Sequence, residues 1–182
     1  VCYFVNSGSE ANELALRLAR EHTKAKGMIT MDHGYFGNTT GAIDISAYKF
    51  NKPGGVGQPD WLELVEIPDD YRGAYKKEDP NRGKKFAGQI NQAIEKLKSK
   101  NQNLCGFIAE TFPSVGGQII TPPGYLAEVY RQIRESGGVC IADEVQTGLG
   151  RLGNHYFGFE YQKVCPDIVV LGKPIGNGHP VG

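Results

Sequence analysis

Short apolar runs that alternate with amphipathic helical patterns constrain the fold of this chain more than any other feature. Leu104–Ala109, Val139–Ala142 and Ile168–Leu171 are apolar throughout, as expected of strands covered on both faces. Between the first two runs, apolar residues recur at helical spacing from Leu126 to Ile133. Strands that alternate with helices imply right-handed crossovers. The pattern therefore predicts an α/β fold, with a mostly parallel sheet and helices on both faces.

The rest of the chain continues this alternation. We expect further strands at Val1–Asn6, Met28–Met31 and Trp61–Ile67. We expect helices at Ser9–His22, at Phe86–Leu97 and from Pro122 to Gly137, a short segment near Gly41–Ser46, and a polar loop at Pro68–Gly83. In the first helix the expected apolar positions are Ala11, Leu14, Ala15 and Leu18. With 182 residues, the chain is long enough for one domain with its own core.

The charge balance argues against two classes of partner. Lys and Arg number 20, as do Asp and Glu, so no net field attracts nucleic acid or an anionic membrane. No apolar stretch approaches the roughly 20 residues that cross a bilayer. The chain opens on Val1 rather than Met, so it carries no information on targeting.

The cysteines and histidines show no metal-binding pattern. The four cysteines (Cys2, Cys105, Cys140 and Cys165) lie far apart, and the first three fall in strand-like runs. We expect reduced, mostly buried thiols in a reducing compartment such as the cytoplasm or the mitochondrial matrix. None of the four histidines has a second histidine three to five residues away, so we expect no metal site.

The polar residues that follow the predicted strands converge on one edge of the sheet. Glu110, Asp143 and Lys173 each come directly or almost directly after an apolar run, and the Ser7-Gly8-Ser9 turn follows the first expected strand. Ligands of parallel sheets bind beyond the carboxyl ends of the strands. The candidate chemistry is therefore expected at this edge.

A lysine and an acid at strand ends are the two parts that a pyridoxal phosphate enzyme needs. Lys173 lies in a glycine-rich turn, and a desolvated amine there would have a lowered pKa that favours imine formation. Asp143 could hold a protonated ring nitrogen. The alternatives are a solvated lysine and a structural or magnesium-holding acid. An ATPase also needs G-x-x-x-x-G-K-[ST], but here Pro174 follows the lysine and Asp167 occupies the first glycine position.

Two further segments each allow two interpretations. The Ser7-Gly8-Ser9 turn could bind a phosphate through backbone N–H groups at a helix N-terminus, or Ser7 could simply cap the helix. Tyr35 and Phe36 could present a flat face to a ring, or could pack within their loop.

With these residues assembled, the chain resembles the class III aminotransferases, which are fold-type I pyridoxal phosphate enzymes. The resemblance covers the chain from end to end. It rests on Ser-Gly-Ser-Glu-Ala-Asn at 7–12, Ala-Asp-Glu-Val-Gln-Thr-Gly-Leu-Gly-Arg at 142–151 and Pro-Asp-Ile-Val-Val-Leu-Gly-Lys at 166–173.

The resemblance implies catalytic roles at the second and third motifs. Lys173 would hold the cofactor as a Schiff base and move the α-proton of the substrate. Asp143 would pair with the pyridinium nitrogen, Val145 would pack under the ring, and Gln146 would reach the phenolic oxygen of the cofactor.

The same resemblance implies cofactor contacts elsewhere in the chain. Gly8 and Ser9 would bind the cofactor phosphate, Tyr35 would stack on the ring, and Glu110 would help to order the site. The family usually has histidine after the stacking aromatic, whereas this chain has Phe36. Any polar role of that histidine is therefore lost.

A closer resemblance is to the ethanolamine-phosphate and 5-phosphohydroxylysine phospho-lyases within this family. Its marks are Ile45–Phe50, Asp70–Gly73, Gly116–Ile120 and the Gly172–Pro180 turn. Such an enzyme would eliminate phosphate from a phosphorylated amine and release aldehyde and ammonia. An ordinary transaminase would instead move the amino group to a keto acid, and a non-catalytic module would only hold the cofactor.

Members of the family are longer than this chain. We expect residues 1–182 to be part of the cofactor-binding large domain, incomplete at both ends and without the small C-terminal domain. The family sites form across a homodimer, so we expect little or no turnover from this piece alone.

Overall fold

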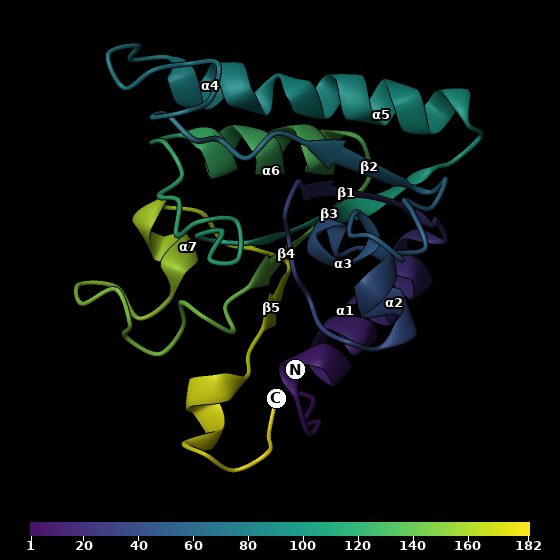
Figure 1. Cartoon of the computed structure of the whole chain (residues 1–182), viewed down its shortest axis with the longest axis vertical. Coiled ribbons are helices and arrows are strands. Elements are labelled where there is room, and N and C mark those ends of the chain that lie inside the picture. Colours follow the sequence, from purple (N-terminus) through teal and green to yellow (C-terminus); the bar gives the residue numbers. More distant parts are fainter.

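Five parallel strands form the single sheet of the computed structural model, which describes residues 1–182 (Figure 1). The strands are β1 (Gly27–Met31), β2 (Leu62–Val65), β3 (Leu104–Glu110), β4 (Val139–Asp143) and β5 (Ile168–Val170). Their order in the sheet is β2-β1-β3-β4-β5, and every neighbouring pair is parallel. The predicted parallel sheet is confirmed.

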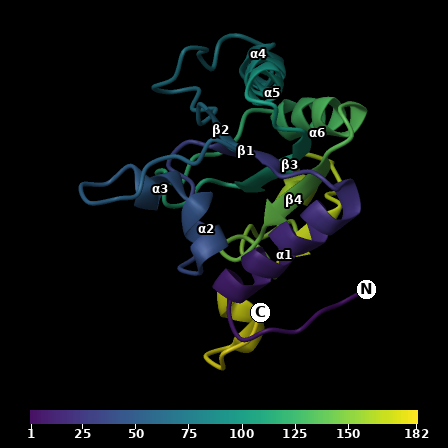
Figure 2. The same cartoon turned by 90° about the vertical axis from the view of Figure 1, so that its right-hand side faces the viewer.

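Helices cover both faces of this sheet, as predicted (Figure 2). One face packs against α4 (Arg82–Ala87), α5 (Gln89–Ser99) and α6 (Tyr125–Glu135). The other packs against α1 (Gly8–Thr23), α2 (Thr40–Asp44) and α3 (Ala47–Phe50). A further short helix, α7 (Gly158–Tyr161), and a 3-10 turn, Lys173–Gly176, lie on either side of β5 in the chain. Each face therefore has its own hydrophobic layer.

Alternate strand residues divide between these two layers. Ile29 and Met31 of β1 belong to the layer beneath α4, α5 and α6, whereas Met28 belongs to the layer beneath α1. All three side chains are almost completely buried. Burial on both faces explains why these strands are continuous apolar runs in the sequence.

The sheet order creates a switch point between β1 and β3. The chain leaves β1 through α2 and α3 toward β2 at the edge, then returns through α4 and α5 to β3 on the other side of β1. Because right-handed crossovers in opposite directions use opposite faces, the helices change face here. The connections diverge at such a point and leave a crevice at the carboxyl ends of the strands.

The N-terminal segment differs from the prediction. Val1–Asn6 is not a strand, because its only backbone pairing is with the C-terminal residue: Val5 N–H donates to Gly182 at 3.0 Å, and Gly182 N–H donates to Val5 at 2.9 Å. A strand needs a continuous neighbour, and β5 is not hydrogen-bonded to this segment.

Several helix and strand limits also differ. The strand expected at Trp61–Ile67 is only Leu62–Val65 in the structure. The helix expected at Phe86–Leu97 is divided into two helices, α4 and α5, which meet at Gly88. The first of them begins at Arg82, inside the predicted loop. Neither α7 nor the 3-10 turn was predicted from the sequence. The buried stripe of α1 consists of Asn12, Ala15, Leu16 and Ala19, so it is rotated from the expected one.

The expectation of mostly buried thiols is wrong for two of the four cysteines. All four thiols are free; Cys105 and Cys140 are buried in the sheet, whereas Cys2 and Cys165 are exposed. Cys2 is exposed because its segment does not join the sheet. Burial raises the pKa of the Cys140 thiol to about 12, so this thiol is unreactive.

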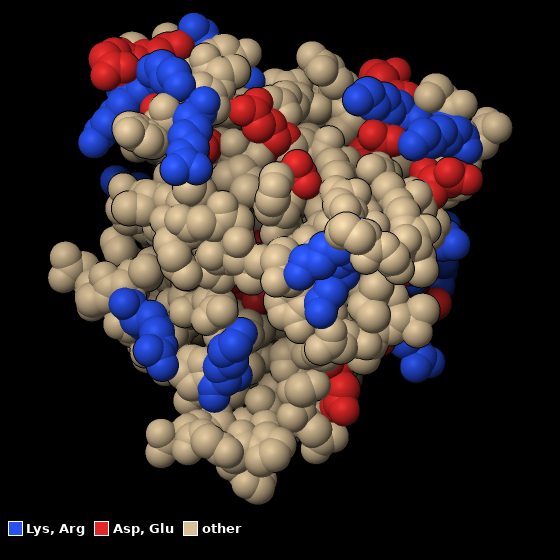
Figure 3. Space-filling view, viewed as in Figure 1, with Lys and Arg blue, Asp and Glu red and all other residues tan.

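The surface charges are dispersed over the face seen in Figure 3. Both signs occur toward its upper end, where α4 and α5 lie, whereas the visible charges over the β4–α7 loop and the C-terminal turn are Lys or Arg (Figures 1 and 3). None of the helices is both long and apolar enough to span a bilayer.

Candidate functional site

A cavity of about 220 Å³ lies at the carboxyl ends of β1, β3 and β4. It brings together every residue that the sequence analysis proposed for the site: Gly8, Ser9, Tyr35, Glu110, Asp143, Val145, Gln146 and Lys173. These residues come from five different segments of the chain, which the switch point of the sheet gathers at one edge.

Asp143, the last residue of β4, forms the polar floor of the cavity. Its side chain is buried, with 4% exposed. One carboxylate oxygen accepts a hydrogen bond from Asn12 Nδ2 at 2.8 Å, and the other accepts one from the Val145 N–H at 2.9 Å. Asn12 Nδ2 also donates to the Phe36 carbonyl at 3.0 Å, which ties α1 to the loop after β1.

Burial raises the pKa of Asp143 to about 7. The hydrogen bonds from Asn12 and Val145 oppose this increase in pKa, the negative charge of Glu110 adds to it, and the positive charge of Lys173 opposes it. A buried carboxylate with this pKa is strongly stabilised by a cationic N–H donor placed against it. The floor of the cavity therefore has the character of a receptor for a protonated nitrogen.

The N-terminus of α1 forms a second polar wall. Ser7 is the N-cap, and its Oγ accepts from the Glu10 N–H at 3.2 Å, so the capping interpretation of Ser7 is confirmed. Gly8 and Ser9 begin the helix, where backbone N–H groups have no intrahelical partners. Ser9 Oγ accepts from the Asn38 N–H at 3.2 Å, which fixes its rotamer. Capping and anion binding are thus compatible, because they use different residues of one turn.

Close approach of two glycines places the lysine turn against this helix. A Cβ on Gly172 would lie 3.2 Å from the Cα and N of Gly8, and a Cβ on Gly8 would lie 3.0 Å from Val145 Cγ2. Lys173 follows with φ of 42°, a left-handed conformation that costs about 1–2 kcal/mol in a residue other than glycine. The expected desolvated setting is not seen, since the Lys173 side chain is exposed and reaches from the cavity into a second one beside it.

Glu110, the last residue of β3, ties two loops to the cavity rim. It is buried, and it accepts hydrogen bonds from the backbone N–H of Ser114 at 3.1 Å and of Tyr35 at 3.3 Å, and from the Ser114 hydroxyl. The Tyr35 ring is half-buried and meets the Tyr48 ring edge-on at 6.0 Å. The position that departs from the family pattern, Phe36, is 2% exposed and belongs to the core layer beneath α1.

Glu144 was not anticipated as a functional residue. It is completely buried, and its carboxylate accepts from the Thr111 hydroxyl at 2.6 Å, from the Thr147 hydroxyl, and from the backbone N–H of Gly158 and Phe159 at 2.8 and 2.9 Å. These bonds hold the loop that carries Val145 and Gln146 against α7. The sequence signal that could have identified Glu144 is its position directly after Asp143 at the end of an apolar run.

Asn12 was quoted within a motif but given no role. The signal that could have identified it is its place on the buried stripe of α1, where its neighbours Ala15, Leu16 and Ala19 are apolar. A polar residue on a buried helical face requires a partner, and the partner here is Asp143.

Pyridoxal phosphate fits this set of donors and acceptors. Asp143 offers a buried acceptor for a ring N–H, the start of α1 offers free N–H groups for a phosphate, and Lys173 offers an amine. A side chain at position 8 would press against Val145, since its Cβ would lie 3.0 Å from Val145 Cγ2. No three His, Cys, Asp or Glu side chains are grouped so that they could hold a metal ion.

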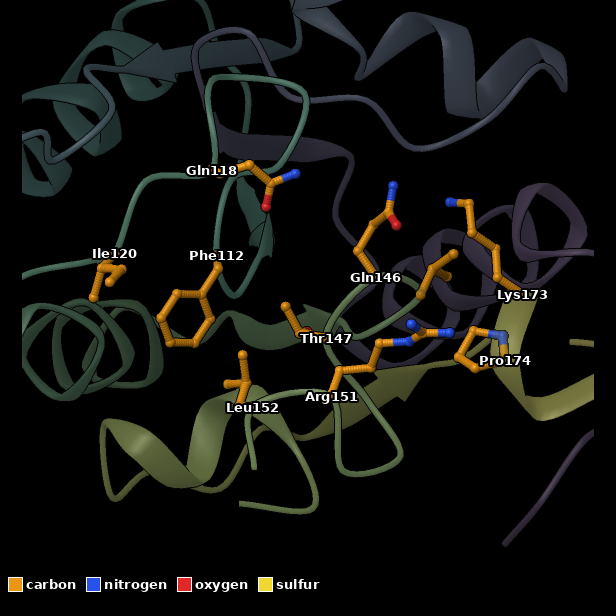
Figure 4. A pocket seen from close by; sticks show the side chains of 10 residues that line it. Phe112, Gln118, Ile120, Gln146, Thr147, Arg151, Leu152, Lys173 and Pro174 are labelled. Atoms are coloured by element: carbon orange, nitrogen blue, oxygen red, sulfur yellow. The ribbon is translucent and has the colours of Figure 1, made fainter. Parts of the chain in front are cut away.

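The second cavity has a volume of about 510 Å³ and shares Val145, Gln146 and Lys173 with the first. Figure 4 shows its lining from the loops after β3, β4 and β5. The other residues that line it are Phe112, Gln118, Ile120, Thr147, Arg151, Leu152 and Pro174. Lys173 therefore stands between the cavity that fits the cofactor and a larger space that is open to the loops.

Comparison with known proteins agrees with this geometry. The family model described as "Aminotransferase class-III" matches residues 1–182. The "Alanine--glyoxylate aminotransferase 2-like" protein of Drosophila melanogaster is 51% identical over 185 residues, which cover 100% of this chain and 37% of that protein. The "Ethanolamine-phosphate phospho-lyase homolog 1" of Caenorhabditis elegans is 40% identical over 189 residues, which cover 98% of this chain and 40% of that protein.

Among solved structures, the chain is similar to a phospholyase from Arthrobacter in complex with phosphoethanolamine. The TM-score is 0.86 and the sequence identity 36%, over 99% of this chain and 42% of the other. The chain thus spans about two fifths of the length of the relatives it matches.

Proposed function

Because the chain belongs to the class III aminotransferase family, we propose that the whole protein is a pyridoxal-phosphate-dependent phospho-lyase that acts on a phosphorylated amine. The observation that carries the cofactor part of this proposal is the arrangement of the buried Asp143 and the Lys173 amine around one cavity at the carboxyl edge of the sheet. The products would be inorganic phosphate, an aldehyde and ammonia.

The residues that hold the cofactor follow from the geometry of the cavity. Asp143 would accept the ring N–H, with Asn12 and Val145 fixing the orientation of its carboxylate. Gly8 and Ser9 would bind the cofactor phosphate through N–H groups and a hydroxyl at the start of α1.

Four more residues of this cavity would contact the ring or order its surroundings. Tyr35 would stack on the ring, Val145 would pack under it, and Gln146 would reach its phenolic oxygen. Glu110 would keep the loops of Tyr35 and Ser114 in place through the hydrogen bonds described above.

The proposed reaction uses this chain's lysine as the proton carrier. When bound, pyridoxal phosphate supplies an electron-withdrawing ring that stabilises negative charge on the carbon next to nitrogen. The Lys173 amine takes the proton from that carbon, and the C–O bond to phosphate breaks with its electron pair leaving on the phosphate. The enamine that results takes up one water molecule and gives the aldehyde and ammonia.

The choice of a phospho-lyase is supported by the phospho-lyases among the relatives, and the segments Ile45–Phe50 and Gly116–Ile120 resemble that branch. The second candidate is an ordinary transaminase, favoured by the 51% identity to a protein named as an aminotransferase-like protein. Both reactions begin with the same proton transfer to Lys173, so the cavity residues serve either. A module that only holds the cofactor would bind it at Lys173 without any proton exchange.

Phosphate release without a keto acid separates these candidates. The whole protein is loaded with pyridoxal phosphate and mixed with phosphoethanolamine in the absence of any acceptor, and inorganic phosphate and acetaldehyde are measured. We expect one of each per substrate consumed. Turnover that appears only when a keto acid is added would replace the phospho-lyase with a transaminase. Absence of deuterium exchange from solvent into the substrate would leave only the non-catalytic module.

Three coarser features of the whole protein are part of the proposal. Residues 1–182 would be part of the cofactor-binding large domain, the whole protein would be a homodimer with a small-molecule amine as its substrate, and this piece alone would have little or no turnover. A reducing compartment is supported by four free thiols, two of them exposed. Sedimentation of the whole protein and a turnover assay on residues 1–182 test the dimer and the inactivity.

A further inference from the structure

The segment Ile45–Phe50, which resembles the phospho-lyases, contributes no residue to either cavity. It follows α2 directly and contains α3, and its residues Ile45 and Phe50 are at most 3% exposed. Both belong to the hydrophobic layer beneath α1, which also contains Phe36. The segment is therefore anchored in the same layer as the loop that carries Tyr35.

Two hydrogen bonds join this segment to the residues on either side of Tyr35. The Phe36 N–H donates to Ser46 Oγ at 2.9 Å, and the Tyr48 N–H donates to the Gly34 carbonyl at 3.2 Å. These two bonds hold the peptide groups that precede and follow the Tyr35 Cα. Because a peptide group is planar and stiff, holding both of them fixes the direction of the Tyr35 Cα–Cβ bond.

The hydroxyl of Ser46 is fully committed to this arrangement. Ser46 is completely buried, and its Oγ donates to the Ala42 carbonyl at 2.5 Å. Since a hydroxyl has a single proton to donate, the Phe36 N–H meets an oxygen whose lone pair is turned toward it. Alanine at this position would remove the acceptor of an N–H group in a residue that is only 2% exposed.

The side chain of Tyr35 also depends on α3. Its half-buried ring lines the smaller cavity. The Tyr48 ring meets it edge-on at 6.0 Å, and Lys49 Nζ lies 5.5 Å from its centroid. Both of these neighbours are residues of α3. The ring is thus held by contacts from α3 on its outer side, while it faces the cavity on the other.

We propose that Ser46 is a positioning residue for the cofactor: through the Phe36 N–H it orients Tyr35 so that its ring stacks on the ring of pyridoxal phosphate. Tyr48 supports the same orientation through its edge contact. This inference rests on the proposed function, in which Tyr35 stacks on the cofactor. The segment Ile45–Phe50 therefore acts on the cofactor ring without contacting it.

A stacking contact depends on orientation, which is why the support from Ser46 matters. Two aromatic rings attract each other in offset-stacked or edge-to-face arrangements, and a ring turned away from these loses the contact. A half-exposed tyrosine on an unsupported loop would sample several rotamers. A ring that is oriented before the ligand arrives loses less conformational entropy on binding.

The test uses pyridoxine phosphate, in which an alcohol replaces the aldehyde of the cofactor. This compound cannot form an imine with Lys173, so its Kd for the cofactor-free whole protein reports only the ring and phosphate contacts. Calorimetry measures this Kd. For Ser46→Ala we expect it to rise about 3- to 10-fold, which corresponds to the loss of one aromatic stacking contact. For Tyr48→Leu, which removes only the edge contact, we expect a rise of about twofold.

A double-mutant cycle separates this role from a general loss of structure. In Tyr35→Ala the stacking ring is absent, so a residue that acts through that ring has nothing left to orient. Adding Ser46→Ala to Tyr35→Ala should therefore leave the Kd at the value of Tyr35→Ala alone. A merely structural role of Ser46 would raise the Kd by the same factor in both backgrounds.

Two controls account for changes in stability and for the loss of a hydroxyl. Leu97 of α5 is completely buried on the other face of the sheet, so Leu97→Ala should lower the thermal unfolding midpoint without changing the Kd. Ser99→Ala removes an exposed hydroxyl at the end of α5 and should change neither quantity.

The outcomes distinguish this inference from the proposed function. If pyridoxine phosphate binds to Ser46→Ala as it binds to the parent protein, the positioning role is overturned and cofactor binding stands. Independent effects of Ser46→Ala and Tyr35→Ala overturn the role as well. If Ser46→Ala does not fold, Tyr48→Leu carries the same cycle with the same expectation.

Two further results concern the parent protein itself. If it binds pyridoxine phosphate with the expected coupling but releases no phosphate from phosphoethanolamine, the lyase reaction is wrong and the positioning role stands. If it does not bind pyridoxine phosphate at all, both the cofactor site and the role of Ser46 are overturned.

Discussion

The two cavities that meet at Lys173 are built in different ways. The smaller cavity has a buried floor: Asn12 donates to Asp143, Glu110 accepts from the Tyr35 N–H, and these three side chains are each at most 5% exposed. The larger cavity is lined by loops, and Gln118, Gln146 and Arg151 in its lining are exposed, whereas Thr147 is buried. Strand ends and a helix terminus fix the first cavity, whereas turns after the strands form the second.

This difference in construction separates cofactor binding, which requires one fixed geometry, from substrate binding, which can vary between proteins. A cofactor needs its ring nitrogen and its phosphate held in one geometry, which rigid elements provide. Substrates differ in their distal groups, and loops on a rigid scaffold can change without moving the floor. Chains with the same floor can therefore act on different amines.

Replacement of Lys173 should damage both cavities at once and have the largest effect. In Lys173→Ala, turnover of the whole protein should fall at least about a thousandfold, because the proton carrier is lost. Borohydride should no longer attach the cofactor covalently, which intact mass measures. Lys163→Ala is a matched control, because Lys163 is also an exposed lysine with positive φ. Unchanged turnover in Lys173→Ala would remove this residue from the reaction.

Replacement of Asp143 should affect only the floor of the smaller cavity. Its effect on the unfolding free energy should depend on pH. The folded-state pKa of about 7 lies above the ordinary value of 3.8, so the folded protein keeps a proton that the unfolded chain releases. The stability of the cofactor-free protein should therefore fall, relative to Asp143→Asn, as the pH rises from about 4 to about 7, by on the order of a few kcal/mol.

Urea unfolding at a series of pH values measures this difference in unfolding free energy between the parent protein and Asp143→Asn. The exposed Asp60 provides the control, since Asp60→Asn should give a curve parallel to that of the parent protein. Parallel curves for Asp143→Asn as well would mean that burial does not raise the pKa of Asp143 in the folded protein.

Replacement of Glu144 should have a smaller effect, mainly on the loop that carries Val145 and Gln146. Glu144→Ala leaves two backbone N–H groups and two hydroxyls without their acceptor, and we expect a loss of about 3 kcal/mol in unfolding free energy. Binding of pyridoxal phosphate should weaken as well, because the loop that carries Val145 and Gln146 loses its support.

The exposed Glu135 of α6 provides the matched control for Glu144. It pairs only with Arg131 at the surface, so Glu135→Ala should cost less than about 0.5 kcal/mol. Urea unfolding followed by circular dichroism measures both variants. Equal stabilities would show that the buried carboxylate does not support the loop.

The sequence predicts the sheet and the strand-end residues of the smaller cavity (Glu110, Asp143 and Lys173) from local signals, whereas Val145 and Gln146 were assigned from the family resemblance. Continuous apolar runs mark strands buried on two faces, and the polar residues directly after them must lie at one edge of a parallel sheet. Val1–Asn6 shows the limit of this argument: its composition suits a strand, but a strand also requires a neighbour, which composition does not reveal. Cys2 is exposed for the same reason.

The partners of buried polar groups could not be read from the sequence. Asn12 and Glu144 were seen only as parts of motifs, because the acceptor of Asn12 and most donors to Glu144 lie on other segments. Spatial pairing between distant segments is the information that a single sequence lacks.

The hydrogen bond between Asn12 and Asp143 joins residues 131 positions apart, and this separation has a kinetic consequence. Contacts of long sequence separation form late in folding, since a large loop must close first. During synthesis, α1 is made well before β4. Until Asp143 is in place, the side-chain amide of Asn12 on the apolar stripe of α1 therefore has no carboxylate acceptor. The acid end of the site is therefore completed only in the last stage of assembly, so refolding rates of Asn12 variants would report on that final docking step.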